Sequence, residues 1–256
     1  TEKPVRLSPR SPLSGVVGLL DRIGFLELVP YALILLLIVG LMMMEPHMSG
    51  TLLILAGAAA VLFAAGIKLY WFLGGGALLA GMVLLLMSGY QSTRILVWQD
   101  PWAYPQDGGW QIIQSLYAIG SGGLLGLGLG KSRQKFLYLP EPENDFIFAI
   151  VCEELGLIGA AVILILFALL VIRGYWIAIH ARDRFGALLV VGITTLTAVQ
   201  VFLNIAVVTN LIPTTGISLP FFSYGGTALM IQLAEMGVVL SVSRQIPPTK
   251  QEVSDL

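Results

Sequence analysis

The chain has 256 residues, of which 57% are apolar and only 11% are Asp, Glu, Lys or Arg, against about 25% charged residues in a typical soluble domain. The mean hydropathy of +0.88 and several uncharged stretches long enough to cross ~30 Å of hydrocarbon predict an all-α, polytopic membrane protein. A net charge of −1 without a basic tail argues against nucleic-acid binding, and the single Cys152 excludes an internal disulfide bond.

In chain order, a polar lead-in of residues 1–22 comes first, and no signal peptide is visible. Because the chain begins with Thr1 rather than Met, we expect it to be a fragment of a longer protein. Six apolar segments follow and are predicted to span the membrane, at about 23–44, 51–67, 69–90, 146–172, 185–208 and 225–243. The expected architecture is a polytopic transmembrane helical bundle with a large extracytoplasmic loop at 91–145 and a cytoplasmic tail at 244–256.

The placement of charge decides whether the 23 uncharged residues between Asp107 and Lys131 form a seventh span. Leaving them outside puts ten Lys and Arg residues on one side of the membrane and four on the other, whereas threading them through gives eight against six. Cytoplasmic loops carry the excess of Lys and Arg, so the first arrangement is favoured. We therefore expect six spans, cytoplasmic termini and an interfacial or re-entrant stretch on the outer face.

This parity places the 91–145 loop and the 209–224 loop on one extracytoplasmic face, where they can form a common site. Pro213, Gly216 and Pro220 keep the second loop irregular. Irregular backbone at membrane depth must be buried in protein or line a water-filled space. The candidate chemistry is therefore expected on the outer face.

Asp145 stands where a polar, proline-framed segment meets the apolar segment 146–172. A carboxylate held at a membrane surface is expensive to place, which indicates a function. Two roles are open and compatible. Asn144 or Asp145 caps the following helix, or Asp145 acts as a general base whose affinity for protons is raised by lost solvation.

Lys131, Arg133 and Lys135 alternate, so in an extended segment all three point the same way. They are interpreted either as a solvated loop at the membrane surface or as a cationic patch for a phosphate or pyrophosphate group. The preceding glycines resemble a nucleotide-binding loop, but Leu125 stands where that motif requires glycine.

Three glutamates are further candidates for substrate binding or for support of the site. Glu153 and Glu154 lie about two turns beyond Asp145, and one of them is expected to pair with a basic residue and hold the loop. Glu154 is also a candidate substrate-binding residue. Glu235 is costly to bury in a span and indicates a lined cavity or a substrate contact.

The amides Gln200, Asn204 and Gln232 lie in the last two predicted spans. Gln200 with Asn204, and Gln232 with Glu235, form polar pairs on helix faces. Intramembrane amides commonly hold helices together. Alternatively, these three amides and Glu235 would line a polar path across the membrane. No spacing of His, Cys and carboxylates resembles a zinc or iron site.

Seven motifs share one resemblance, namely Arg94–Trp102, Gly109–Ser115, Gly120–Lys135, Tyr138–Pro140, Asp145–Phe148, Glu153–Gly156 and Pro213–Gly226. They resemble the family of shape, elongation, division and sporulation proteins, the bacterial peptidoglycan polymerases of the RodA, FtsW and SpoVE type. The resemblance runs from the first span to about Arg244. Because members usually have ten spans, it implies that this chain corresponds to the last six.

The resemblance also implies roles for particular residues. The essential loop aspartate of the family falls on Asp145. The sequence departs from the family at Glu45–Gly50, where many members read Gln-Pro-Asp-Leu-Gly, and at Glu143–Asn144, where His-Thr is common. The first departure leaves any acid at that turn in doubt, and neither touches the assignment of Asp145.

The implied reaction is glycosyl transfer between two lipid II molecules during cell elongation, division or sporulation. The acceptor's 4-hydroxyl attacks C1 of the donor sugar and expels undecaprenyl pyrophosphate with a single inversion, so one general base suffices. Asp145 is the expected base, with Lys131, Arg133 or Lys135 at the pyrophosphate. A divalent cation such as magnesium or manganese is left open there, and no organic cofactor is expected.

The resemblance further implies a multi-pass protein of the bacterial cytoplasmic membrane with an extracytoplasmic active site. Its expected partners are lipid II, membrane lipid and a class B penicillin-binding protein, which is a transpeptidase. Two alternatives stay open, a lipid II flippase and a non-enzymatic scaffold for the transpeptidase. A flippase should depend on Glu235 and tolerate loss of Asp145, a polymerase should do the reverse, and a scaffold should tolerate both changes.

Overall fold

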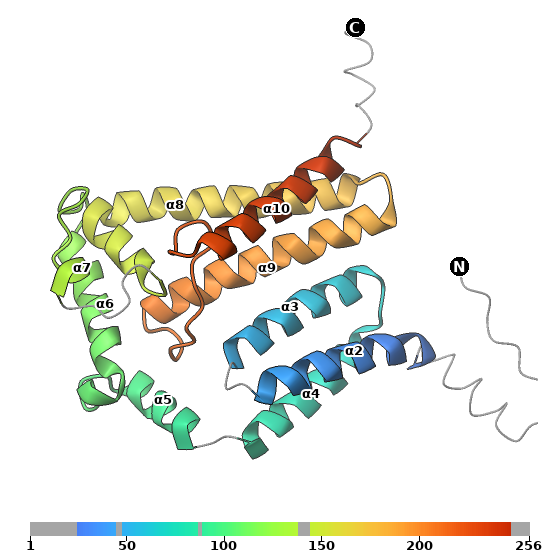
Figure 1. Ribbon diagram of the computed structural model, residues 1–256, viewed down its shortest axis with the longest axis horizontal. Coiled ribbons are helices and arrows are strands. Elements are labelled where there is room, and N and C mark those ends of the chain that lie inside the picture. Colours follow the sequence, from blue (N-terminus) through green and yellow to red (C-terminus); the bar gives the residue numbers. More distant parts are fainter. Residues whose placement is uncertain (1–24, 45–47, 87–88, 138–143, 247–256) are drawn as a thin grey trace, which may run out of the picture.

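The computed structural model describes residues 25–44, 48–86, 89–137 and 144–246 (Figure 1). Every regular element within these residues is helical, which confirms the all-α prediction for them. The elements are α2 (Phe25–Met44), α3 (Met48–Ala64), α4 (Leu69–Leu86), α5 (Gly89–Gln99), the 3₁₀ turn η1 (Pro105–Asp107), α6 (Gly109–Gly122), α7 (Gln134–Leu137), α8 (Ile147–His180), α9 (Arg184–Val208) and α10 (Gly226–Ser243).

Each of the six predicted spans lies mainly over one helix, α2, α3, α4, α8, α9 or α10, and the third also reaches the first two residues of α5. Three of these, α8, α9 and α10, are long and apolar enough to cross a membrane, and α2 and α3 contain shorter apolar stretches at Leu28–Met42 and Ser49–Ala64. Helix α8 continues to His180, beyond the predicted end of the fourth span at 172. The number and direction of the crossings stay a prediction, and the lead-in 1–22 lies outside the described residues.

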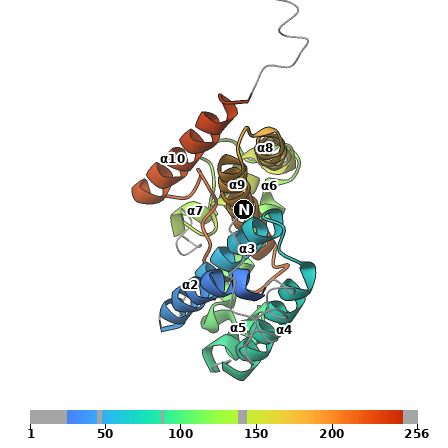
Figure 2. The ribbon, with the colours of Figure 1, turned by 90° about the vertical axis from the view of Figure 1, so that its right-hand side faces the viewer.

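Helix α9 is the centre of the arrangement. Figure 1 shows α8 and α9 running antiparallel, with α10 crossing beside them and α5, α6 and α7 gathered at one end. Helix α3 packs against α9 on the side away from α10, and α2 packs against α3 (Figure 2). Because α9 packs against α3, α8 and α10, it is also the most buried of the three long helices.

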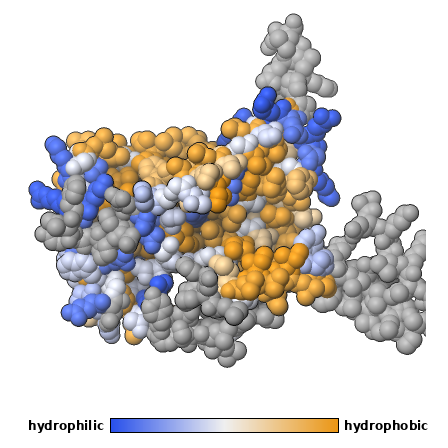
Figure 3. Space-filling view, viewed as in Figure 1, coloured by the Kyte–Doolittle hydropathy of each residue, from blue (hydrophilic) through white to orange (hydrophobic). Residues whose placement is uncertain are grey.

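The outward faces of the long helices are apolar. Exposed side chains on α8 include Leu166, Leu169 and Ile172, at 60%, 56% and 64% of their surface. Figure 3 shows the hydrophobic surface running along the helices, with hydrophilic residues concentrated towards the two ends. Exposed apolar area of this extent suits contact with lipid rather than with water.

The predicted outer loop 91–145 contains the helices α5, α6 and α7, so it is more ordered than expected. Helix α6 occupies much of the uncharged stretch 108–130, and it packs against α8. Its polar residues Gln114 and Ser115 are 5% and 0% exposed, and the Ser115 hydroxyl donates a hydrogen bond of 2.8 Å to the carbonyl of Val208. The polar side of α6 is therefore covered by protein.

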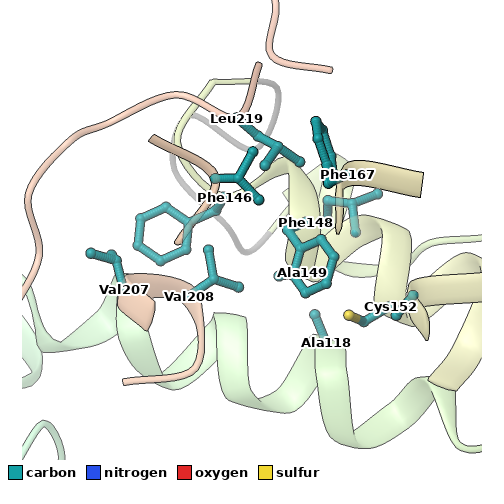
Figure 4. Packing of buried hydrophobic residues seen from close by; sticks show 12 residues of the cluster. Ala118, Phe146, Phe148, Ala149, Cys152, Phe167, Val207, Val208 and Leu219 are labelled. Atoms are coloured by element: carbon teal, nitrogen blue, oxygen red, sulfur yellow. The ribbon is translucent and has the colours of Figure 1, made fainter. Parts of the chain in front are cut away.

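The larger buried apolar cluster lies at the same end of the molecule. It joins Ala118 of α6, Phe146 and Phe148 at the start of α8, Val208 at the end of α9 and Leu219 of the following loop (Figure 4). Each of these residues is at most 3% exposed. The cluster thus fixes the residue that follows Asp145 against both outer loops.

Helix α8 is broken at Gly156, whose backbone angles of φ 67° and ψ −170° are not helical. The segment Ile147–Leu155 runs at a steep angle to the rest of α8 (Figure 1). A break leaves backbone groups without partners inside the helix, and these groups must find others when they are buried. The glycine-rich loop between α6 and α7 supplies them.

Four backbone hydrogen bonds join this loop to the break. Leu127 and Gly128 donate to the carbonyls of Glu153 and Glu154 at 2.9 and 3.0 Å, and two return bonds of 2.9 and 3.2 Å run from Leu157 N to Gly123 O and from Ile158 N to Leu124 O. The close approach of the loop to α8 requires a glycine on each of the two segments. A Cβ on Gly126 would lie 2.2 Å from the carbonyl oxygen of Glu154, and one on Gly156 would lie 2.3 Å from the nitrogen of Gly126.

Candidate active site

The loops 91–145 and 209–225 meet at Asp145, and the side of the membrane on which they lie stays a prediction. Asp145 is half-buried and precedes Phe146, which occupies the cap position of α8 without a side-chain hydrogen bond. Nδ2 of Asn204 donates to the backbone carbonyl of Asp145 at 2.8 Å and to that of Ile217 at 2.7 Å. Because Asn204 is 1% exposed, a buried amide of α9 ties the aspartate to the 209–225 loop.

The Asp145 carboxylate lies against Gly216 of that loop. A Cβ on Gly216 would come 3.4 Å from Oδ2 of Asp145, and the residue has φ +73°. That backbone conformation favours glycine, since other residues meet a steric penalty there. The loop therefore presents bare backbone to the carboxylate.

Side chains of α9 and α10 hold the rest of the loop. Nε2 of Gln200 donates to the carbonyl of Ser218 at 3.1 Å, and Oε1 of Gln232 accepts from the backbone amide of Phe221 at 2.8 Å. Phe221 has φ +64°, an uncommon conformation for a bulky residue, and such conformations persist only where the surroundings enforce them. The intramembrane amides thus hold the loop, which agrees with the interpretation that they act as structural contacts.

The segment around α5 and the residue before Asp145 secure the same loop from the other side. Nη1 of Arg94 donates to the carbonyl of Thr214 at 3.0 Å. The Ser223 hydroxyl donates to the carbonyl of Asn144 at 2.6 Å and accepts from the amide of Leu219 at 2.7 Å. The 209–225 loop is therefore fixed by side chains of α5, α9 and α10 and by the backbone carbonyl of Asn144.

The cationic segment differs from the extended conformation predicted for it. Lys131, Arg133 and Lys135 are all exposed, but Lys135 lies in α7. The Ser132 hydroxyl accepts from the amide of Lys135 at 3.1 Å, the pattern of a serine that caps a helix. The prediction that the three side chains share one extended face is wrong, because this cap starts a helical turn.

Glu153 anchors this segment. Its carboxylate, 1% exposed, accepts from the Ser132 hydroxyl and from the Arg133 amide, the latter at 3.0 Å. A glutamate therefore holds the loop as expected, but through a hydroxyl and a backbone amide. Glu154 is half-buried, and its Oε1 lies 3.4 Å from the amide of Ser132.

One helical segment connects the two parts of the site. Glu153 is eight residues beyond Asp145, which corresponds to about 12 Å along a helix. Lys131 and Arg133 flank Ser132, whose hydroxyl donates to the Glu153 carboxylate. The candidate base therefore lies just before this helical segment, and the cationic segment is attached near its end.

Glu235, half-buried on α10, lies one turn beyond Gln232. Of the four groups in the candidate polar path, Gln200, Asn204 and Gln232 hydrogen-bond to backbone at or near the 209–225 loop. The contacts of these amides support the loop that packs on Asp145. They do not bring Glu235 to Asp145.

The described residues contain no group of three His, Cys, Asp or Glu side chains able to hold a metal ion. Two oxygens of α9 and the 209–225 loop are nevertheless buried without a hydrogen-bond partner among those residues, Oδ1 of Asn204 and Oγ1 of Thr215. Oxygen donors suit magnesium and manganese. Magnesium is commonly held by one or two carboxylates together with substrate phosphates, and the donors here fit that kind of binding.

Several supporting residues were not assigned a role from the sequence, namely Arg94, Ser132, Ser223 and Gly156. Ser132 carries a local signal, because a serine three residues before Lys135 is a typical helix start. The others act on backbone groups more than 70 residues away or through a break in an apolar helix. Such contacts leave no short-range pattern.

The sequence model of the FtsW/RodA/SpoVE cell cycle proteins matches residues 22–247. Stage V sporulation protein E of Bacillus subtilis (strain 168) is 49% identical over 206 residues, which cover 80% of this chain and 56% of that protein. A probable peptidoglycan glycosyltransferase FtsW of Trichlorobacter lovleyi is 44% identical over 227 residues, covering 87% of this chain and 60% of the relative.

Among solved structures, a chain from a peptidoglycan synthase complex, studied for its coordination of polymerization and crosslinking, superposes with a TM-score of 0.68 at 33% identity. The match covers 84% of this chain and 61% of that chain. The chain therefore spans less than two thirds of the length of the relatives and structures it matches.

Proposed function

The chain belongs to the FtsW/RodA/SpoVE family of cell cycle proteins, and we propose that it carries the active site of a peptidoglycan glycosyltransferase that polymerises lipid II into glycan strands. The observation that carries the proposal is the seating of Asp145 between the two outer loops. Its backbone is held by the buried Asn204 and its carboxylate faces Gly216. A loop carboxylate secured in this way is suited to a positioned proton transfer.

In the proposed reaction, Asp145 accepts the proton of the acceptor's 4-hydroxyl as that oxygen attacks C1 of the donor sugar. The bond between C1 and the pyrophosphate oxygen breaks, and its electron pair leaves with undecaprenyl pyrophosphate. One displacement inverts C1, so an α-linked donor gives a β-1,4 product with a single general base. No covalent sugar–enzyme intermediate is needed.

Pyrophosphate leaves readily once its charge is compensated, so the cations matter more than a general acid. Lys131 and Arg133 are exposed on a segment that Glu153 fixes to the same helix as Asp145, and Lys135 follows in α7. Glu154 adjoins this segment and is kept as a candidate substrate contact. A divalent cation held by Asn204 Oδ1 and Thr215 Oγ1 together with substrate phosphate would supply further charge compensation.

The apolar helices suit a substrate whose C55 tail stays in the bilayer while its sugars react at the surface. We place the site on the extracytoplasmic face, on the strength of the Lys and Arg distribution. A class B penicillin-binding protein is the proposed partner, supported by the likeness to a synthase complex that both polymerises and crosslinks. The reaction would serve elongation, division or sporulation.

A lipid II flippase is the rival from another class, and it requires a polar path across the membrane. The amides Gln200, Asn204 and Gln232 instead bond to backbone at the outer site. The three amides are therefore engaged by the backbone near Asp145 and do not form a continuous polar row across the described helices. The contacts therefore favour the polymerase over the flippase.

The test is polymerisation of lipid II in liposomes by the full-length protein with its transpeptidase. Asp145→Asn removes the base while keeping the shape of the side chain, and we expect turnover to fall by about 10²–10⁴-fold. Glu235→Gln serves as the matched variant and should retain polymerisation. Melting temperatures of both variants establish that they are folded.

Three outcomes would contradict the proposal. Normal glycan strands from Asp145→Asn would mean that another residue is the general base. Loss of lipid II transport on Glu235→Gln, with transport intact in Asp145→Asn, would establish the flippase. If the parent complex made no glycan strands but still bound the transpeptidase, the non-enzymatic scaffold would be the supported alternative.

A further inference from the structure

The end of the molecule opposite Asp145 carries an exposed stack of three side chains on α8. The Arg173 guanidinium carbon lies 4.1 Å from the centre of the Trp176 ring. The His180 ring stacks on Trp176 at 4.3 Å with an angle of 24°. Two groups this close to one ring centre cannot share a face, so the indole lies between the cation and the imidazole.

The stack is rigid and faces outward. Nδ1 of His180 bonds to the carbonyl of Trp176 at 2.8 Å, and since a carbonyl only accepts, Nδ1 carries the hydrogen. Trp176 is 40% exposed, and Ile172 and Ile179 beside it are 64% and 80% exposed. These apolar neighbours mark the surface as one that faces lipid.

Its depth matches the edge of the hydrocarbon. Arg173 is 17 residues beyond the break at Gly156, or about 26 Å along the helix, and the hydrocarbon is about 30 Å thick. An arginine at this depth extends its side chain towards the headgroups. A tryptophan at the same level is typical of a membrane interface.

The charge of Arg173 is not balanced locally. Within the described residues it contacts the indole and forms no ion pair with a carboxylate. The one carboxylate at the α8–α9 turn is Asp183, and Oδ2 of this residue caps α9 by accepting from the Gly186 amide at 2.8 Å. Arg182 and Arg184 add exposed positive charge beside it.

We propose that Arg173, Trp176 and His180 form a binding site for the phosphodiester of an anionic phospholipid such as phosphatidylglycerol. Stacking on the indole fixes the guanidinium and leaves N–H groups to donate to phosphate oxygens. The indole covers the glycerol end of an acyl chain, and the neighbouring arginines favour a lipid with net negative charge. This site is independent of the proposed glycosyl transfer.

The test uses native mass spectrometry of the full-length protein in detergent, incubated with equal amounts of phosphatidylglycerol and phosphatidylcholine of identical chains. We expect preferential retention of phosphatidylglycerol, reduced about five-fold by Arg173→Gln, since one cation near a headgroup contributes about 1 kcal/mol. Lys68→Gln is the matched control, an exposed cation between α3 and α4 whose Nζ lies 6.0 Å from the centre of the Tyr70 ring, and should change nothing. Arg173→Lys keeps the charge but loses the planar stack, and should give partial loss.

Equal retention of the two lipids by the parent would overturn the proposal, as would unchanged retention in Arg173→Gln. A further arm adds inorganic phosphate to the lipid-bound parent. Displacement of the lipid by phosphate alone would show a simple anion site and would overturn the lipid assignment. Persistence of the lipid would support it.

Discussion

The two parts of α8 on either side of Gly156 have similar apolar composition but different surroundings. Before the break, Phe148, Ala149 and Ile150 are at most 5% exposed and pack on α6, α9 and the 209–225 loop. After the break, Leu166 and Ile172 are at least 60% exposed. The first part is buried by protein and carries the candidate site, whereas the second presents a surface for lipid.

This difference teaches that burial in a membrane protein has two meanings. A side chain in lipid has left water, but its neighbours are interchangeable hydrocarbon tails as apolar as leucine. A side chain in the protein core has fixed neighbours, and removal leaves a cavity. Substitutions on the two sides of Gly156 should therefore differ in cost although their hydropathy is alike.

The largest effect on stability is expected from Gly156→Ala, which attacks the boundary between the two parts. The new Cβ would lie 2.3 Å from the Gly126 nitrogen, at a residue with φ +67°. We expect the free energy of unfolding to fall by about 5 kcal/mol or more, because backbone atoms on both sides must move. Thermal unfolding in detergent measures the loss.

Gly120→Ala on α6 is the control for that change, since a Cβ there meets nothing within 4 Å. It should gain up to about 1 kcal/mol from helix propensity. Equal melting temperatures for the two alanine variants would show that the loop does not need close approach at the break.

A smaller effect, about 3–5 kcal/mol, is expected when Phe148→Ala empties part of the buried cluster. The matched change beyond the break is Leu166→Ala, at a residue 60% exposed, which should stay within about 0.5 kcal/mol. Chemical or thermal unfolding of both variants in one detergent gives the comparison. Similar losses at the two positions would mean that the outward face of α8 is covered by protein in the complete chain.

The smallest effect separates two neighbouring glutamates. Glu153→Gln should cost about 1–3 kcal/mol, because a buried carboxylate that accepts from Ser132 and Arg133 loses its charge. If the cations bind pyrophosphate, the KM for lipid II should rise more than kcat falls. Glu154→Gln, with its longer contact to Ser132, should change both constants less. Indistinguishable kinetics for the two variants would remove Glu153 from the positioning of the cationic segment.

Hydropathy located the six apolar segments because a helix in lipid must be apolar over its length, and every one of them overlaps a helix. It could not locate the break in α8. A single glycine inside an apolar run is compatible with a continuous helix, whereas the structure shows Gly156 non-helical where the loop after α6 docks. Helix α6 was not predicted for a similar reason. The polar residues of α6 are covered by neighbours that are distant in sequence.

Asp145 could be singled out because a carboxylate at the start of an apolar segment is unusual, and its assignment as the base stays a prediction. The surroundings of Asp145 could not be predicted. Asn204 and Gly216 reach it from 59 and 71 residues away, through a backbone carbonyl and a missing side chain. Neither kind of contact is visible in residue types alone.

The docking of the glycine-rich loop on the break also bears on the order of folding. The four bonds that join the loop to α8 link groups about 30 residues apart, so the closed loop is short and its entropic cost modest. The segment Ile147–Leu155 has nine residues, too few to be a stable helix by itself. We expect it to become helical only when the loop docks, so the base and the cationic segment should acquire their structure in a single cooperative step after the long spans have inserted.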